Sequence, residues 1–377
     1  MKGRSLAFLC WACVLAASIL IHSPVVFHAV PQGSSSGYHV IRNILLGGEG
    51  GWDYVTVDPD AKRVYIPRST DIMVVDEGTG KMIADITGLQ GLHGVAVAPE
   101  FNRGLVTGND PDAEIWLLDL KALKVTGKLT APGAKGSDSL MYDSASKRAF
   151  INTAASNNAQ AVDAASGKIA GTVTFPGRPE AAVPDGKGSM FVNIVDKSRI
   201  VEYDTKTLTV KNNWSSEPCF RGYGLSMDRA HRRLFIGCQG SASPQRDEPG
   251  SASKNLLVVM NADNGKVVAS LPIGIGTDGT AYDPGTGDVF VTCRDSGDGK
   301  SGATYVFHED SPDKYTKIAE VKTIYGARTI GLDSKTHHVF SIGTEKTIPC
   351  HPRRTIRIRG PGPCPARSPW SKSENKP

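Results

Sequence analysis

Seven polar residues with side chains suited to proton transfer or charged-ligand binding recur along this chain at regular intervals. Successive members are 40, 45, 42, 43, 55 and 50 residues apart. They are Asp53, His93, Asp138, Glu180, Tyr223, Asp278 and Arg328. If a repeating fold gathers them, the four carboxylates will raise one another's pKa or recruit a cation, with His93 and Arg328 as counterparts.

The intervals follow from a repeat in which each of these residues stands five positions before a turn. The turn positions are Asp58, Ala98, Asp143, Asp185, Asp228, Asp283 and Asp333. In the first unit, Gly51 to Leu89, alternating apolar residues and turn residues predict four strands: Asp53 to Val57, Arg63 to Ile66, Asp71 to Val75 and Met82 to Ile86. The unit is therefore predicted to be a four-stranded antiparallel meander.

The second strand of the unit returns six times, and so do the third strand and its turn in most units. The second strands read RVYI (63–66), RGLV (103–106), RAFI (148–151), SMFV (189–192), RLFI (233–236), DVFV (288–291) and HVFS (338–341). The third-strand motifs read VVDEGTGK, LLDLKALK, AVDAASGK, EYDTKTLT and VMNADNGK. A repeat of this length made of four short strands is typical of a β-propeller blade.

With these motifs the chain resembles the YVTN-type, YncE-like seven-bladed β-propeller repeat family over about residues 38 to 345. The resemblance implies an all-β ring of seven four-stranded antiparallel blades. It implies no particular reaction, because propellers carry unrelated functions.

Ring closure is predicted to involve the N-terminal strand-like segment, Tyr38 to Leu46, which belongs to no complete unit. We expect it to form the outer strand of blade seven, which would remove an exposed sheet edge. Blade seven is the weakest blade, because no apolar third strand follows Val339 to Ile342. Only Thr355 to Ile358 alternates enough to replace it.

The two ends of the chain differ from the repeats. Lys2 and Arg4 precede an apolar run from Ser5 to Ile21, so residues 1–29 are predicted to be a secretory signal; the alternative is an uncleaved anchor. A flexible leader (30–37) follows, and the mature protein is expected to be periplasmic or secreted. The Pro- and Arg-rich tail (346–377) is either disordered or the product of a shifted reading frame.

The basic charge of the chain is concentrated in this tail. From Lys346 onward there are eight Lys and Arg and one acid, within a chain of net charge +5, so residues 1–345 carry a net charge of −2. Nucleic-acid binding through the tail is thus one hypothesis, and a solvated tail is the alternative. The acidic body argues against nucleic-acid binding by the propeller itself.

Five cysteines remain outside the predicted signal: Cys219, Cys238, Cys293, Cys350 and Cys364. Cys219 and Cys238 flank the same end of one predicted hairpin in blade five, which makes them the disulfide candidate. Two free buried thiols are the alternative.

In a propeller, the seven recurrent polar residues would surround one mouth of the central channel. Residues expected near the same mouth form a secondary rim: Trp52, Arg68, Asn109, Asn152, Asn193 and Arg221. The alternative is a water-filled channel lined by polar groups that hold no ligand.

Three function classes compete. The first, and our preferred interpretation, is a monomeric non-catalytic scaffold that binds a small-molecule or protein ligand at the mouth, with a divalent metal as the one cofactor under consideration. The second is an enzyme: a lactonase-like hydrolase with Asp53, Glu180 and Asp278 as metal ligands, or a quinoprotein-like oxidoreductase. Only His93 joins the recurrent set, so no three-His zinc or copper centre is expected. The third class is nucleic-acid binding through the tail.

Overall fold

The computed structural model describes residues 37–48, 50–109, 113–240 and 255–343, and all of its strands lie in the compact unit His39–Pro377. The predicted signal (1–29), all but the last residue of the leader and the tail (346–377) lie outside the described residues. Across the described ranges, no helix has the length and apolar character needed to cross a membrane.

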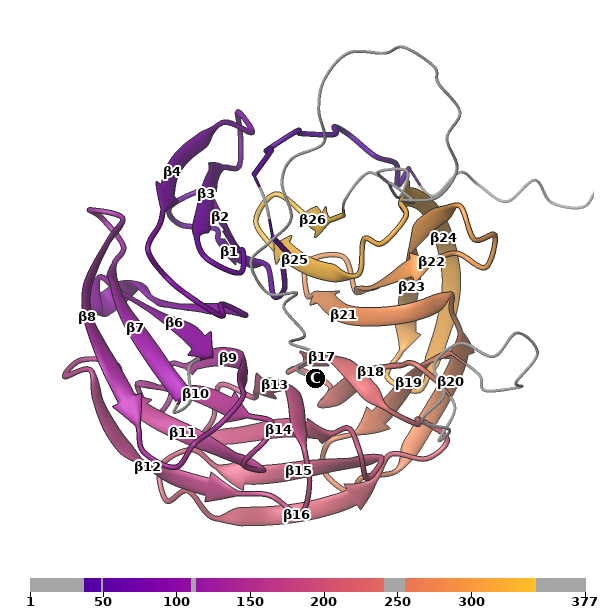
Figure 1. Cartoon of the computed structure of the whole chain (residues 1–377). Coiled ribbons are helices and arrows are strands. Elements are labelled where there is room, and N and C mark those ends of the chain that lie inside the picture. The colour runs from indigo at the N-terminus through magenta and orange to yellow at the C-terminus, as the bar shows by residue number, and fades with distance from the viewer. Residues whose placement is uncertain (1–36, 49, 110–112, 241–254, 344–377) are drawn as a thin grey trace, which may run out of the picture. The chain divides into compact units, whose positions relative to one another are not determined.

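Six four-stranded antiparallel sheets follow one another along the chain (Figure 1). The first three are β1 (Thr56–Asp58), β2 (Arg63–Pro67), β3 (Ile72–Asp76) and β4 (Met82–Ile86); β5 (Val95–Ala98), β6 (Arg103–Asn109), β7 (Ala113–Asp119) and β8 (Lys124–Ala131); and β9 (Ser137–Asp143), β10 (Arg148–Thr153), β11 (Asn158–Asp163) and β12 (Lys168–Thr174). The next three are β13 (Pro179–Pro184), β14 (Ser189–Ile194), β15 (Arg199–Asp204) and β16 (Val210–Ser215); β17 (Gly222–Asp228), β18 (Arg233–Cys238), β19 (Leu256–Asn261) and β20 (Val267–Pro272); and β21 (Ile275–Asp283), β22 (Asp288–Asp295), β23 (Ser301–Ser311) and β24 (Lys314–Ile324). One 3-10 turn, η1 (Pro99–Phe101), links β5 to β6.

The first strand of each sheet lies innermost, and these strands contact one another in sequence around a ring. A further sheet of only two strands, β25 (Thr329–Asp333) and β26 (His338–Ile342), lies between the sixth blade and the first, because β25 contacts both β21 and β1. The propeller therefore has six four-stranded blades instead of the predicted seven. The described residues hold no third or fourth strand after β26, in line with the lack of an apolar third-strand motif there in the sequence.

The prediction that Tyr38 to Leu46 forms the closing strand is wrong, because residues 37–48 contain no strand. An outer strand must pair with a third strand, and blade seven offers only two described strands. The segment instead lies against the first blade, where Arg42 donates hydrogen bonds to the carbonyls of Gly78 and Thr79. Leu46 packs beside the apolar cluster between the first blade and β26.

The blades are held together by strands whose two faces are both buried. In β2, Val64 and Ile66 pack toward the two-stranded sheet, whereas Tyr65 between them packs toward the second blade. Successive side chains of a strand point to opposite faces, so an unbroken apolar strand contacts both neighbouring sheets. This explains the continuous apolar second strands seen in the sequence.

The recurrent turn aspartates have a structural role. Asp143 accepts hydrogen bonds from the backbone nitrogen and hydroxyl of Ser146, and Asp283 accepts one from the Gly285 nitrogen. Both aspartates are fully buried. Such contacts close the turn between the first and second strands and fix the register of each hairpin.

Candidate functional site

The seven recurrent polar residues all stand at the same end of the innermost strands. Asp53 and His93 precede β1 and β5, and Arg328 directly precedes β25. The other four lie near the starts of their strands: Asp138 in β9, Glu180 in β13, Tyr223 in β17 and Asp278 in β21. Since these strands surround one centre in Figure 1, the seven residues stand at one end of the ring of inner strands. We call this set the mouth cluster.

Within the mouth cluster, His93 lies between two aspartates. Its Nδ1 lies 2.7 Å from Asp53 Oδ2 and 3.8 Å from Asp138 Oδ1. One ligand atom of each of the three lies within 4.8 Å of the other two, which is compatible with a shared metal ion. The alternative ligand set of the lactonase hypothesis, Asp53 with Glu180 and Asp278, is not the set that the described residues bring together.

Glu180 is held by residues that the repeat comparison did not include. Arg178 Nη2 lies 3.3 Å from Glu180 Oε2 and 3.9 Å from Asp138 Oδ2. The Tyr54 hydroxyl of the first blade donates to Glu180 Oε1 of the fourth blade at 2.8 Å. Tyr54 also packs against the apolar cluster shared by the fourth and fifth blades, so its side chain spans the ring axis.

The remaining members form two further contacts. Arg328 Nε lies 2.9 Å from Asp278 Oδ2 as an ion pair, without the alignment of a hydrogen bond. Gln239 Nε2 donates to Asp278 Oδ1 at 3.2 Å. Arg221 stacks over the Tyr223 ring and donates to its hydroxyl at 2.9 Å.

The acidity of the mouth cluster is shifted by burial and mutual repulsion. Burial, and then the Asp53 charge, raises the pKa of Asp138 to about 6. Burial raises the pKa of Asp278 to about 7, although the Arg328 charge opposes that shift. Burial and the Asp138 charge also raise the pKa of Glu180 well above its ordinary value. The arginines therefore compensate these carboxylates only in part.

The pKa of His93 is also raised, mainly by its hydrogen bond to Asp53. A histidine that shares its proton with a neighbouring carboxylate favours its charged form. His93 therefore behaves as an internal counter-ion, and a metal ion bound by His93 and the two aspartates would displace its proton.

Most of the predicted rim residues are structural. Arg68 donates to the carbonyls of Gly47, Gly50 and Gly51, and Trp52 forms an isolated bridge with Arg68. Asn152 and Asn193 are fully buried and join neighbouring blades through the carbonyls of Glu180 and Gly224. Asn109 ends β6. Arg221 contacts a side chain of the mouth cluster, that of Tyr223, whereas Asn152 contacts only the backbone of Glu180.

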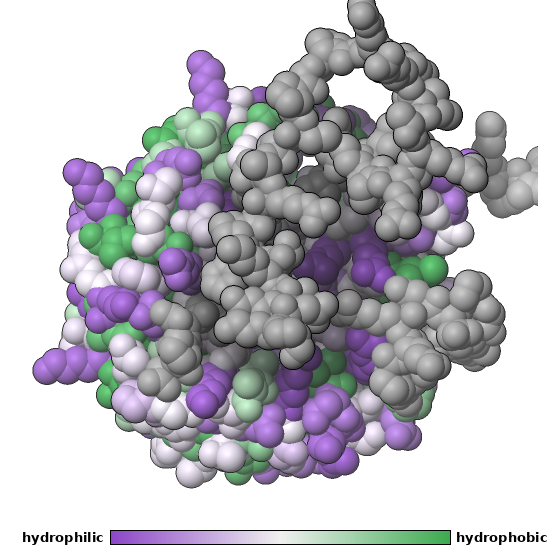
Figure 2. All heavy atoms as spheres, viewed as in Figure 1, coloured by the Kyte–Doolittle hydropathy of each residue, from purple (hydrophilic) through white to green (hydrophobic). Residues whose placement is uncertain are grey.

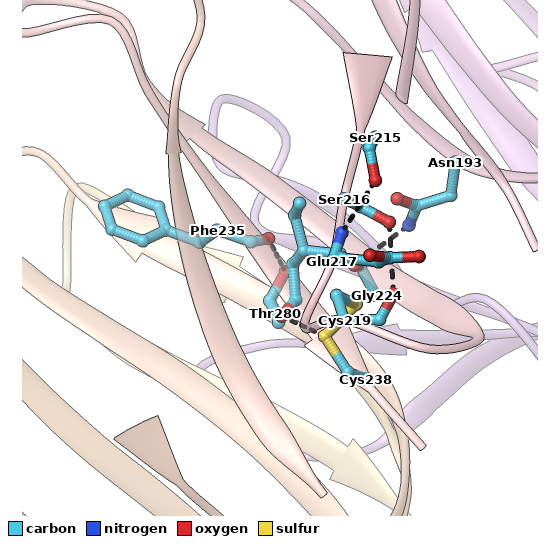
Figure 3. Close-up of a disulfide and its surroundings, with 10 residues drawn as sticks. Asn193, Ser215, Ser216, Glu217, Cys219, Gly224, Phe235, Cys238 and Thr280 are labelled. Atoms are coloured by element: carbon cyan, nitrogen blue, oxygen red, sulfur yellow. Dashed lines mark hydrogen bonds between the residues drawn. A yellow bond between two sulfur atoms is a disulfide. The ribbon is translucent and has the colours of Figure 1, made fainter. Parts of the chain in front are cut away.

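A disulfide lies in the fifth blade, next to residues of the mouth, and Figure 3 shows the bond and its surroundings. The sulfurs of Cys219 and Cys238 are bonded, with the Cα atoms 5.3 Å apart. Cys238 pairs with Gly222 across the hairpin, and the Gln239 nitrogen donates to the Arg221 carbonyl. The bond therefore secures the strand ends that carry Arg221, Tyr223 and Gln239. Cys293 is buried as a free thiol, and burial raises its pKa.

Three mouth residues were missed by the sequence comparison: Tyr54, Arg178 and Gln239. A signal for Arg178 was present, because the position two residues before the cluster is Gly in five units and Arg in two (Arg178 and Arg221). Tyr54 stands where five other units have Gly, Ala or Ser, so its large side chain was the signal in the sequence.

Comparisons with known proteins show the fold. No family model matches the chain, and no curated protein matches it in sequence. A solved structure of Kuenenia stuttgartiensis hydrazine synthase is similar, with a TM-score of 0.64 and 15% identity over 82% of this chain and 99% of that one. The RRP9 WD40 repeats align with a TM-score of 0.64 and 7% identity, over 79% of this chain and 89% of theirs. A mitotic checkpoint complex chain aligns with a TM-score of 0.63 and 10% identity, over 91% and 96% of the two chains. At such identities the likeness establishes a WD40-like β-propeller and no activity.

Proposed function

We propose that this chain is a non-catalytic binding propeller whose mouth cluster takes a divalent cation or a small organic cation. The observation that carries the proposal is the half-buried pair Asp53 and Asp138 on either side of His93, with ligand atoms within 4.8 Å of one another. Burial raises the pKa values of Asp138, Glu180 and Asp278, and a cation is a better counter-ion for such carboxylates than a shared histidine proton.

The rest of the mouth cluster supports selection of a small ligand. Tyr54 spans the axis and binds Glu180, so the carboxylates face a site of limited depth. Arg178 and Arg328 are partly exposed and limit the net negative field. On the part of the face that the described residues form in Figure 2, hydrophilic and apolar residues are intermixed, without one broad apolar patch.

The cellular setting is part of the same proposal. We place the protein in the periplasm or outside the cell, as a monomer related to the YncE-like propellers, with β25 and β26 as the inner half of a seventh blade. The Cys219–Cys238 disulfide supports an oxidising compartment. A solvated tail, with no nucleic acid bound, agrees with the acidic body.

A thermal-shift screen of divalent metals and polyamines tests the proposal. The proteins are the wild type, the double variant Asp53→Asn with Asp138→Asn, and the control Asp60→Asn, which changes an exposed aspartate. We expect at least one cation to raise the melting temperature of the wild type and of the control but not of the double variant. The proposal is wrong if no cation shifts the wild type, or if every active cation shifts the double variant equally.

A further inference from the structure

A second group of metal-compatible side chains lies between the fifth and sixth blades, at the ends of the inner strands farthest from the mouth. Asp228 ends β17, His231 follows in the next turn, and Glu309 lies in β23 of the neighbouring blade. His231 Nδ1 lies 2.7 Å from Asp228 Oδ2 and 3.2 Å from Glu309 Oε1. One ligand atom of each lies within 4.8 Å of the others.

The repeat shows which member of this group is unusual. Glu309 follows His308, the third-strand residue that pairs with the start of the second strand, and its nitrogen donates to the Gly287 carbonyl. The equivalent residues make the same backbone hydrogen bond in the first five blades: Glu77, Leu120, Ala164, Thr205 and Ala262. Four of these five blades use an apolar or hydroxyl-bearing residue there. Packing between blades therefore does not require the carboxylate of Glu309.

Glu309 is buried without the partners that a carboxylate needs. Its side chain is 3% exposed and that of Asp228 is 2% exposed. Among the described residues, no group donates a well-aligned hydrogen bond to either Glu309 carboxylate oxygen. The Tyr282 hydroxyl and the His231 imidazole are its polar neighbours, and His231 Nδ1 is already engaged with Asp228. Leaving a buried carboxylate in this state is costly, and a bound cation would remove the cost.

The surroundings of Glu309 increase that cost. Burial and the Asp228 charge raise the pKa of Glu309, although its contacts with Tyr282 and His231 oppose that shift. Burial and then the Glu309 charge raise the pKa of Tyr282, whose ring stacks on Phe235. The nearby Arg233 is engaged with Asp313 at 2.9 Å instead of with the two carboxylates.

We infer that Asp228, His231 and Glu309 form a divalent transition-metal site that joins the fifth and sixth blades. One imidazole nitrogen and two carboxylate oxygens suit Zn²⁺, whereas a histidine ligand disfavours Ca²⁺ and Mg²⁺. Ligands at about 2.1 Å in a tetrahedral shell lie roughly 3.4 Å apart, so small shifts from the observed separations admit the ion. His231 is 52% exposed, which leaves the ion an entry path and an open coordination position.

The junction between the two-stranded sheet and the first blade supplies a matched comparison. There Glu77 faces the turn aspartate Asp333, but the residue three positions after that aspartate is Thr336 instead of histidine. The Thr336 hydroxyl lies 2.8 Å from Glu77 Oε1 and 3.0 Å from Asp333 Oδ2. Glu77 Oε1 therefore has an aligned hydroxyl donor, with His338 Nδ1 3.5 Å away, whereas neither Glu309 oxygen has an aligned donor. Glu77→Gln serves as the control.

Isothermal titration of the full chain with Zn²⁺ tests the site. Relative to the wild type, we expect Glu309→Gln and His231→Ala each to lose one bound equivalent, and Glu77→Gln to lose none. Glu309→Gln keeps the shape of the side chain, and His231 is half exposed, so both variants retain the fold. If both variants bind as many equivalents as the wild type, or if Ca²⁺ competes equally with Zn²⁺, the inference is wrong.

The mouth variant separates this site from the proposed function. Asp53→Asn with Asp138→Asn should leave the Glu309-dependent equivalent in place, because the two groups lie at opposite ends of the inner strands. Loss of that equivalent in the mouth variant, with Glu309→Gln binding normally, would overturn the second site and support the first. If Glu309→Gln and His231→Ala are the variants that lose a Zn²⁺ equivalent, the second site is supported. The mouth proposal is then tested separately by the thermal-shift screen.

Discussion

The Tyr54 hydroxyl donates a 2.8 Å hydrogen bond to Glu180 across the ring axis, from the first blade to the fourth. Because the two residues are 126 positions apart in sequence, this single contact joins distant parts of the ring. It also keeps a buried carboxylate supplied with a donor, which an apolar channel could not do.

Replacing Tyr54 with Phe should destabilise the protein. The variant removes a donor from a buried carboxylate, and we expect a loss of about 1–3 kcal/mol in the free energy of unfolding. Urea denaturation at pH 8 measures it. Tyr142→Phe is the control, because Tyr142 donates to the exposed Glu100 and its loss should cost less. Equal losses of unfolding free energy in the two variants would show that the Tyr54–Glu180 contact stabilises the protein no more than an exposed hydrogen bond does.

The stability of the protein should fall as the pH rises from about 4 to about 7. An unfolded aspartate titrates near 3.9, whereas the folded pKa is about 6 for Asp138 and about 7 for Asp278. Between these values the folded state binds protons that the unfolded state has released, so raising the pH weakens folding.

Asp278→Asn should remove part of this pH dependence, because the amide cannot ionise. The difference in melting temperature, variant minus wild type, should increase from pH 5 to pH 8. Calorimetry without added cations measures it. Asp60→Asn should run parallel to the wild type. If Asp278→Asn also runs parallel, burial does not raise the pKa of Asp278 as described.

Gly224→Ala should be strongly destabilising, because the backbones of the fifth and sixth blades approach closely there. An added Cβ would lie 2.9 Å from the backbone carbon of Gly279 and from the backbone nitrogen of Thr280. We expect a loss of at least about 2 kcal/mol in chemical denaturation. Gly127→Ala is the control, since its Cβ would meet only Leu117 at 3.7 Å. A Gly224→Ala protein as stable as this control would contradict the close approach.

The disulfide should contribute about 3 kcal/mol, because it closes a loop between residues 19 apart. Peptide mapping without reduction should recover the Cys219 and Cys238 peptides linked. Reductant should lower the melting temperature of the wild type but not of the Cys219→Ser, Cys238→Ser variant. Two freely alkylated thiols in protein from the oxidising compartment would refute the bond.

Much of the propeller could be predicted from the turn aspartates and the second strands. The second strands begin at the predicted residues, for example Arg63, Arg148 and Asp288, because buried apolar runs and Asp-capped turns are local signals. The closing strand could not be predicted in the same way. Its secondary structure depends on whether a third strand offers an edge, and that is decided elsewhere in the chain.

The mouth cluster was predictable as a set of positions and not as a set of contacts. Register places Asp53, His93 and Asp138 at one end of the inner strands, and the structure brings them together. Register does not give side-chain reach, so the contact of Tyr54 with Glu180 was missed. The Glu309 group was missed for a related reason, because its members come from two adjacent blades and from different strands.

The most direct test of the central claim is the affinity of the mouth for its strongest cation as a function of pH. Titration calorimetry on the wild type, on Asp53→Asn with Asp138→Asn, and on Asp60→Asn provides it. We predict that affinity increases at least about tenfold from pH 5 to pH 8, as His93 and Asp138 release their protons, and that the double variant loses binding. A pH-independent affinity, or full binding by the double variant, would contradict a cation site at Asp53, His93 and Asp138.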